Sequence, residues 1–150
     1  MTDINTHLNR MTTSVALCTC DGEKYIKSQL YSILEQTVQV DEIIICDDSS
    51  SDNTIQIVNK IITETNIPIQ VFSNEKRLGV CANFDRAIRL CSSVIILLAD
   101  QDDIWLPTKV DKIVTYFNEN PYVDVLFTNG LFIDSDGMIF TSKNYLMQLG

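Results

Sequence analysis

The sequence predicts an α/β fold in which a mainly parallel sheet carries helices on both faces. Short apolar runs rich in Ile and Val alternate along the chain with longer segments whose apolar residues recur every three or four positions. The short runs are typical of buried parallel strands, and the longer segments are typical of amphipathic helices. Strands and helices that alternate in this way are joined by right-handed crossovers, so the strands run parallel. The alternation therefore indicates one sheet between two layers of helices.

The expected strands are short, apolar and rich in β-branched residues, which pack well on a pleated surface. They comprise residues 14–19, 42–46, 68–72, 94–98 and 123–128. Two further apolar runs, 131–133 and 138–140, flank an Asp-Ser-Asp-Gly sequence that is typical of a turn. This last pattern predicts a β-hairpin at the end of the fold.

The expected helices follow the strands, and each has one apolar stripe that would face the sheet. The first covers residues 23–35, and the second follows a polar loop at 47–54 whose Asp and Ser residues are common N-caps. Pro107 suits the first turn of the last helix. The stripes are Ile26, Leu30, Ile33 and Leu34; Ile57 or Val58 with Ile61 and Ile62; Val80, Phe84, Ile88 and Cys91; and Val110, Ile113, Val114 and Phe117.

The length of 150 residues suits one domain, which we assign to residues 14–150 after a polar extension at 1–13. No apolar run approaches the roughly 20 residues of a membrane span, and the N-terminus lacks the apolar stretch of a signal peptide. The net charge of −9 argues against nucleic acid or an anionic lipid surface as the partner. The five cysteines form no C-x-x-C pair, so we expect free thiols in a reducing cytoplasm.

Three of the expected strands end in polar clusters, at residues 19–23, 47–48 and 100–103. In a parallel sheet these ends meet at the edge that binds ligands. The three carboxylates of 100–103 repel one another, and a divalent cation would relieve that repulsion. The plainer interpretation is a set of helix caps and solvated loops, which we favour for residues 51–52. The convergence of the other clusters favours a ligand site.

Several common catalytic and phosphate-binding motifs are absent from the sequence. It has no G-x-G-x-x-G fingerprint, no Walker lysine loop and no G-x-S-x-G elbow. The one histidine, His7, lies in the polar extension, so no Cys–His pair is expected. These exclusions favour a ligand whose phosphates are held by a metal ion. The other acidic pair would then accept hydrogen bonds from a base or a ribose.

Five segments of the chain, taken in order, carry a further signal. They are 14–26 (SVALCTCDGEKYI), 29–37 (QLYSILEQT), 42–54 (EIIICDDSSSDNT), 77–84 (RLGVCANF) and 98–107 (LADQDDIWLP). Together they resemble glycosyltransferase family 2, and the resemblance extends over residues 14–139. Within that family, the D-Q-D-D-x-W pattern is similar to rhamnosyltransferases and other bacterial transferases of surface polysaccharides.

The resemblance implies a GT-A fold, an inverting mechanism and a nucleotide-diphosphate sugar as donor. It places Asp48 at the base, Asp47 in support of Asp48, and Asp100 at the ribose or the sugar nucleotide. Asp102 would ligate Mg²⁺ or Mn²⁺, which would stabilise the charge that develops on the leaving diphosphate. Asp103 would support the metal ligands or cap the next helix. The implied donor-binding residues are Thr19, Asp21, Glu23, Asp47, Asp48, Arg77, Asn83 and Asp100, and the implied metal ligands are Asp102 and Asp100.

Two positions depart from the family's pattern. Cys20 stands where the family usually has Tyr, and Asp21 stands where it usually has Asn. Loss of the aromatic ring weakens stacking on the base, and an added acid near a diphosphate is unfavourable. The choice between a uridine and a thymidine donor therefore stays open.

We expect a glycosyltransferase that moves a sugar from a UDP- or dTDP-sugar to a saccharide or lipid-linked acceptor in cell-surface polysaccharide synthesis. Family members usually continue beyond this length and carry the acceptor site and the general base there, so we name no base in this chain. The alternative is a non-catalytic nucleotide-sugar-binding fragment of a truncated transferase. A sugar nucleotidyltransferase would need a glycine-rich basic loop, which residues 20–23 do not supply. We expect a cytoplasmic protein; peripheral attachment to the inner face of the membrane, and pairing with a second copy or a partner chain, stay open.

Overall fold

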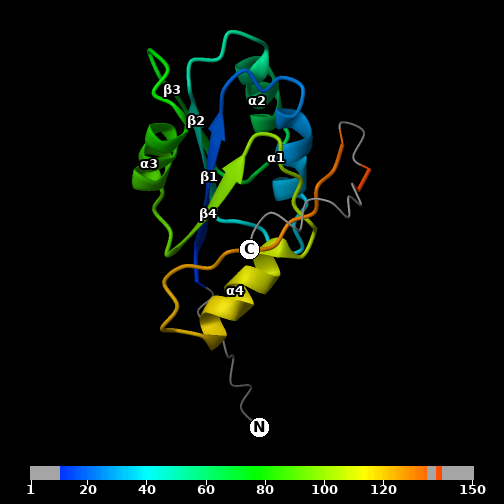
Figure 1. The fold of residues 1–150 in the computed structure, drawn as a ribbon, viewed down its shortest axis with the longest axis vertical. Coiled ribbons are helices and arrows are strands. Elements are labelled where there is room, and N and C mark those ends of the chain that lie inside the picture. Colours follow the sequence, from blue (N-terminus) through cyan, green and yellow to red (C-terminus); the bar gives the residue numbers. More distant parts are fainter. Residues whose placement is uncertain (1–10, 135–137, 140–150) are drawn as a thin grey trace, which may run out of the picture.

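The computed structural model of the chain describes residues 11–134, 138 and 139. Strands and helices alternate along them, as the sequence predicts (Figure 1). The first four expected strands and the four expected helices are confirmed. In chain order the elements are β1 (Thr13–Thr19), α1 (Ile26–Leu34), β2 (Glu42–Asp47), α2 (Thr54–Ile62), β3 (Ile69–Ser73), α3 (Val80–Leu90), β4 (Ile95–Asp100) and α4 (Lys109–Glu119).

The four strands form one parallel sheet in the order β3-β2-β1-β4. The chain therefore builds the sheet outward from β1 in one direction and then returns to the other side of β1 with β4. Such a reversal opens a crevice at the carboxyl ends of the strands, where α/β sheets bind ligands. The register sets Thr19 beside Asp47 and Cys18 beside Asp100, so the acidic strand ends lie at this same edge.

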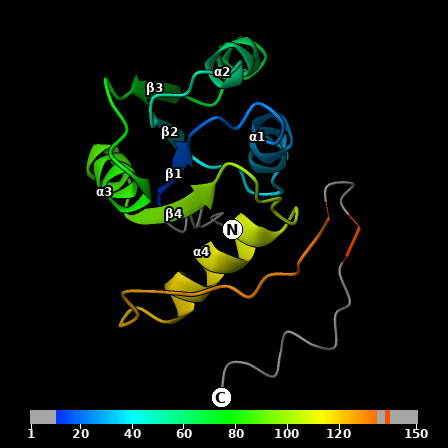
Figure 2. The same cartoon turned by 45° about the horizontal axis from the view of Figure 1, so that its top comes forward.

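Helices cover both faces of the sheet, as expected (Figure 2). Alternate residues of the central strands point to opposite sides, which follows from the two-residue period of a strand. Val15 and Leu17 of β1 belong to the larger core with residues of α1, α2 and α4. Ala16 and Cys18 belong to a smaller core with Ala87 of α3. The two central strands are thus buried on both faces, which accounts for their nearly continuous apolar sequences.

The strands β2 and β4 extend further than the sequence pattern indicates. β2 includes Asp47 and β4 includes Asp100, so the first acid of each cluster is held in the sheet rather than in a loop. The helix α1 begins later than expected, at Ile26, because the preceding residues form a turn in which Tyr25 N and Ile26 N both donate to Gly22 O. The two longer strands give Asp47 and Asp100 fixed positions on the sheet.

The expected strand at 123–128 is wrong, because the structure has no strand there. Its apolar pattern is compatible with a strand, but Val125 and Phe127 are exposed and no strand in the described part of the chain pairs with them. The expected hairpin is represented by one antiparallel bridge between Ile133 and Ile139. Its turn, residue 140 and the segment after it lie outside the described residues, as does most of the polar extension, so these stay predictions.

Two further expectations concern membrane spans and cysteines. None of the helices in residues 11–134 is long and apolar enough to cross a membrane. All five cysteines are free thiols, as expected from their spacing.

Candidate functional site

The site begins where β1 and β2 end side by side. Thr19 Oγ1 donates a hydrogen bond of 2.8 Å to Asp47 Oδ1, and Asp48 N donates one of 2.7 Å to Thr19 O. Asp47 also accepts from Ser50 N at 3.0 Å and from Ser50 Oγ. Asp47 is buried, and its carboxylate closes the turn after β2 in which Ser49 takes a positive φ of 62°. Its oxygens are committed to this turn, so Asp47 sets the position of the residue that follows it.

Asp48 is buried and binds the loop that precedes α3. Its Oδ1 accepts from Leu78 N at 2.6 Å and from Asn74 Nδ2 at 2.8 Å, and its Oδ2 accepts from Gly79 N at 2.8 Å. Burial acts to raise the pKa of Asp48, but these hydrogen bonds and the charge of Arg77 outweigh it and hold the pKa below its ordinary value. The carboxylate is therefore ionised at neutral pH. Since each carboxylate oxygen has two lone pairs, Oδ2 retains the capacity to accept one more hydrogen bond.

Two asparagines lie beneath Asp48. Asn83 Nδ2 donates to Cys46 O at 2.8 Å, and Asn83 Oδ1 accepts from Asn74 Nδ2 at 2.9 Å. The side chain of Asn83 is buried and shared between these two partners, so it ties α3 to β2. Asn74 was not expected from the sequence, although its place directly after β3 repeats the position of the other polar clusters. Arg86 completes the group by donating to Asn74 Oδ1.

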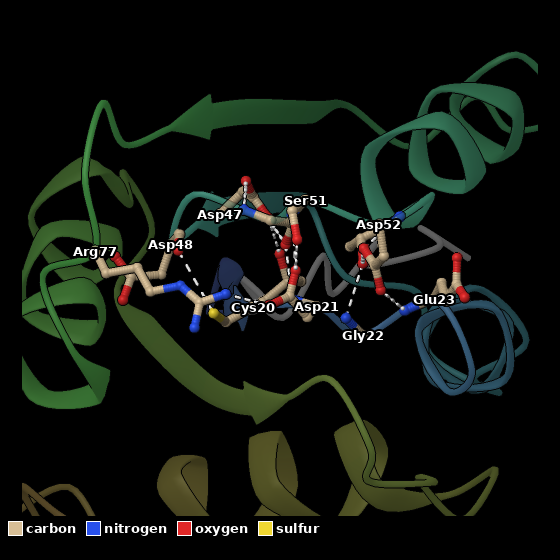
Figure 3. A network of polar contacts seen from close by, with 12 residues as sticks. Cys20, Asp21, Gly22, Glu23, Asp47, Asp48, Ser51, Asp52 and Arg77 are labelled. Atoms are coloured by element: carbon tan, nitrogen blue, oxygen red, sulfur yellow. Dashed lines mark hydrogen bonds and ion pairs between the residues drawn. The ribbon is translucent and has the colours of Figure 1, made fainter.

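The loops after β1 and β2 hold each other through reciprocal hydrogen bonds (Figure 3). Ser51 N donates to Asp21 Oδ1 at 2.7 Å, and Glu23 N donates to Asp52 Oδ2 at 2.9 Å. Asn53 N in turn donates to Glu23 Oε2 at 3.0 Å. Asp52 accepts from Thr54 N just before α2, but the N-cap is Asn53, so Ser51 and Asp52 act mainly by joining two loops rather than as the expected caps. Glu23 is therefore fixed to the neighbouring loop.

Arg77 reaches across this part of the site from the loop after β3. Figure 3 shows its side chain passing Asp48 and Cys20 to form an ion pair with Asp21. Hydrogen bonds from Ser51, together with Arg77, hold the pKa of Asp21 below its ordinary value. The extra acid that departs from the family's pattern is thus paired with a guanidinium. The pairing offsets the negative charge that Asp21 would otherwise add to this edge of the sheet.

The acidic loop after β4 forms the opposite wall. Asp100 is the last residue of β4, and partial burial together with the negative charges of Asp102 and Asp103 raises its pKa above the ordinary value. Asp102 and Asp103 line a hollow of about 270 Å³. Its other lining residues are Lys24, Tyr25, Ser28, Ile104, Ile133 and Asp134.

A divalent cation fits the chemistry of this wall. Burial first, and then the negative charges of Asp102 and Asp103, raise the pKa of Asp100, and a bound cation would offset both effects. No cluster of three or more His, Cys, Asp or Glu residues in the described part of the chain is arranged to hold a metal on its own. Mg²⁺, however, is commonly bound through one or two carboxylates together with substrate phosphates. Asp100 and Asp102 therefore suit a metal that arrives with, or is completed by, a diphosphate.

Comparison with known proteins places this geometry among sugar transferases. Residues 14–147 match the model of Glycosyl transferase family 2. An uncharacterised glycosyltransferase of Haemophilus influenzae is 31% identical over 75% of this chain and 35% of its own length. The Escherichia coli enzyme WfaP, a UDP-Glc:α-D-GlcNAc-diphosphoundecaprenol β-1,3-glucosyltransferase, is 32% identical over 84% of this chain and 48% of its own. The chain thus spans about a third to a half of the length of these relatives.

Solved structures share the fold. S. aureus TarS 1-349 in complex with UDP-GlcNAc superposes with a TM-score of 0.68 at 27% identity, over 74% of this chain and 32% of that one. The mannosyltransferase PcManGT of Pyrobaculum calidifontis, solved with GDP-Man and Mn²⁺, has a TM-score of 0.68 at 22% identity, over 72% of this chain and 32% of that one. The expected GT-A fold is confirmed.

Proposed function

Because the chain belongs to glycosyltransferase family 2, we propose that it forms the donor-binding part of an inverting transferase. The enzyme would move a sugar from a UDP- or dTDP-sugar to a saccharide or lipid-linked acceptor in surface-polysaccharide synthesis. One observation carries the proposal. The buried carboxylate of Asp48 and the acidic loop at residues 100–103 stand on opposite sides of β1, at the crevice where the strand order reverses.

The two walls suit the two ends of a nucleotide diphosphate. The remaining lone pair of Asp48 Oδ2 would accept a hydrogen bond from the N–H of a uracil or thymine ring. Asp100 would contact the ribose or share the metal with Asp102. The metal would neutralise the diphosphate as it leaves, where negative charge develops. We base this division of roles on the surroundings of the carboxylates. Protein groups donate hydrogen bonds to Asp48, whereas Asp100 and Asp102 lie close enough for their charges to repel.

The remaining expected residues act mainly by shaping the crevice. Thr19 and Asn83 hold the strand ends and α3 in place, while Glu23 fixes the loop after β1 through Asn53. Arg77 has a half-exposed side chain whose Nη2 is bound to Asp21, so other guanidinium nitrogens are available to a base carbonyl or a phosphate. We propose direct donor contacts for Arg77 and supporting roles for the other three.

Two of the similar proteins support a uridine nucleotide as the first probe. WfaP is named for UDP-Glc, and TarS was solved with UDP-GlcNAc. We propose that acceptor recognition and the general base are supplied outside the matched residues 14–147, by the same or a partner chain. Peripheral attachment to the inner membrane face would bring this donor site to a lipid-linked acceptor.

Protection against thermal unfolding tests the proposal, since a ligand that binds the folded state raises its apparent stability. With Mn²⁺ present, UDP or dTDP should raise the melting temperature and GDP should not. Protection by none of the three nucleotides would overturn the donor site. Release or transfer of sugar from the protecting UDP- or dTDP-sugar, assayed together with the segment or partner chain that supplies the general base, distinguishes a transferase from the alternative, a non-catalytic binding fragment. A binding fragment would give protection without any sugar release.

A further inference from the structure

Gln101 joins the two loops that form the walls of the site. Its Oε1 accepts from Cys20 N at 2.8 Å, and its Nε2 donates to Cys20 O at 3.1 Å. One side-chain amide thus binds both backbone polar groups of a residue 81 positions away in the sequence. Cys20 is the first residue after β1, and Gln101 is the first after β4. The contact therefore fixes the start of the acidic loop to the start of the loop that carries Asp21.

Gly22 provides the space that this amide occupies. A Cβ added at Gly22 would lie 2.6 Å from Gln101 Cδ and closer still to Oε1. The backbone of Gly22 is held in place, because its carbonyl accepts from Tyr25 N at 2.9 Å and its N–H donates to Thr54 Oγ1 at 2.8 Å. Gly22 is not among the residues with positive φ, so its small size rather than its backbone conformation is what the structure uses. This is a second, independent sign that Gln101 is closely fitted.

The other end of the acidic loop is anchored to α1 and to Gln36, two residues beyond the end of that helix. Trp105 N donates to Ser32 Oγ at 3.0 Å, and Gln36 Nε2 donates to Leu106 O at 2.8 Å. Asp102 and Asp103 thus lie in a short span between the Gln101 contact and the α1 contacts. The hydrogen bonds that fix this loop are made by the residues on either side of the two aspartates. Their positions therefore depend on the two anchors.

We infer that Gln101 is a positioning residue that holds the acidic loop in register with the nucleotide-binding wall. The inference rests on the proposed donor site. A metal bound jointly by protein carboxylates and a diphosphate needs its ligands placed within a fraction of an ångström. Release of the Gln101 contact frees the loop, and ordering it again upon binding weakens the affinity for the metal. Changes to residues that orient metal ligands typically reduce metal affinity by about 10- to 100-fold.

The test is the Mn²⁺ concentration that gives half-maximal UDP binding, measured by calorimetry on the full chain. Gln101→Leu removes both hydrogen bonds at similar size, and Gly22→Ala pushes the amide away while leaving its chemistry intact. Gln70→Leu, at an exposed position on β3, is the matched control. We expect both test variants to need about 10- to 100-fold more Mn²⁺. UDP binding should return at saturating Mn²⁺, because the Asp48 wall is unchanged.

The melting temperature without ligand separates positioning from general stability. A residue that only stabilises the fold would lower the melting temperature and leave the Mn²⁺ midpoint of the folded protein where it is. An unchanged midpoint in both variants, with wild-type binding intact, would overturn the inference and leave the proposed function standing. Failure of the wild-type chain to bind UDP with Mn²⁺ would overturn both. If Gln101→Leu does not fold, Gly22→Ala decides alone.

Discussion

Asp48 is the residue on which the proposed nucleotide wall of the crevice depends. It accepts three hydrogen bonds from the loop that precedes α3, two of them from backbone N–H groups. Bonds to an ionised acceptor are roughly twice as strong as neutral ones. The aspartate therefore shapes this loop and keeps one lone pair that a ligand could use. A neutral replacement tests the first of these roles without any nucleotide.

The variant Asp48→Asn should reduce the free energy of unfolding by about 2 kcal/mol at pH 7. The side-chain NH₂ of the new asparagine would face the Gly79 N–H, and two donors cannot form a hydrogen bond with each other. Asp85→Asn is the control, since Asp85 is an exposed partner of Arg89 on α3 and such pairs contribute little. Urea denaturation measures both. Equal stabilities for the Asp48 variant and the wild type would show that the loop does not depend on this carboxylate.

The same variant should show a distinct pH dependence. The folded pKa of Asp48 is lower than its ordinary value of 3.8, so its ionised form stabilises the folded protein. That contribution is complete above the unfolded pKa and disappears as the pH falls through the folded pKa. The stability difference between wild type and Asp48→Asn should therefore be constant from pH 7 to about 5 and shrink below about pH 4. A difference that persists unchanged at pH 3 and below would contradict the assignment.

The ion pair of Asp21 with Arg77 predicts that nucleotide binding is weaker in a single variant that lacks Arg77 than in a double variant that also lacks the charge of Asp21. Arg77→Ala leaves the charge of Asp21 unpaired at the proposed position of the diphosphate, so UDP affinity should fall by about tenfold. The double variant Arg77→Ala with Asp21→Asn should recover part of that loss, because the neutral amide matches the family's usual residue. Calorimetry at constant ionic strength measures both. A double variant as weak as the single variant would reject the charge-pairing role.

Among the elements, α1 does more than cover the sheet. Ser32 of α1, and Gln36 two residues beyond the helix, contact the segment after the acidic loop. Gln36 Oε1 accepts from Val110 N at 3.0 Å, close to the start of α4, and its Nε2 donates to Leu106 O. A buried polar residue just after the helix thereby fixes both the acidic loop and the following helix.

Gln36→Leu should destabilise the protein by about 1–3 kcal/mol, because it leaves the buried Val110 N–H and the Leu106 carbonyl without this partner. Gln56→Leu, on the exposed side of α2, is the matched control and should change stability little. Chemical denaturation of the two variants gives the comparison. If Gln36→Leu lowers the free energy of unfolding no more than Gln56→Leu does, the segment after Leu106 is held by other contacts.

The positions of the elements were largely predictable, because local patterns determine them. Ile43 to Cys46 has the pattern of a buried strand in isolation, and α4 follows from its apolar stripe and Pro107. The segment 123–128 shows where local pattern is insufficient: its alternation fits a strand, but a strand also needs a neighbour, and sequence pattern does not reveal one. The roles of Gln36 and Gln101 were equally hidden, since each depends on partners 70 to 81 positions away.

At the scale of the molecule, the sequence predicted where the candidate site lies. It predicted much less well what each residue of the site does. Parallel strands required the clusters after β1, β2 and β4 to meet at one edge, and they do. The individual roles depended on the folded loops. Glu23 and Asn83 are engaged by Asn53 and Cys46, and Asp21 by Arg77, none of which their sequence neighbourhoods indicate. The fold therefore separates a hydrogen-bonded wall around Asp48 from an acidic wall at Asp100, Asp102 and Asp103.

We propose that these two walls bind one nucleotide diphosphate through a metal ion. Calorimetry of UDP binding with Mn²⁺ or with EDTA tests it most directly, on the wild-type chain, on Asp102→Ala and on Asp124→Ala as an exposed control outside the site. We predict binding by the wild type and the control with Mn²⁺, and loss of that binding with EDTA or in Asp102→Ala. UDP binding that is independent of Mn²⁺ and of Asp102, or no binding at all, would contradict the claim.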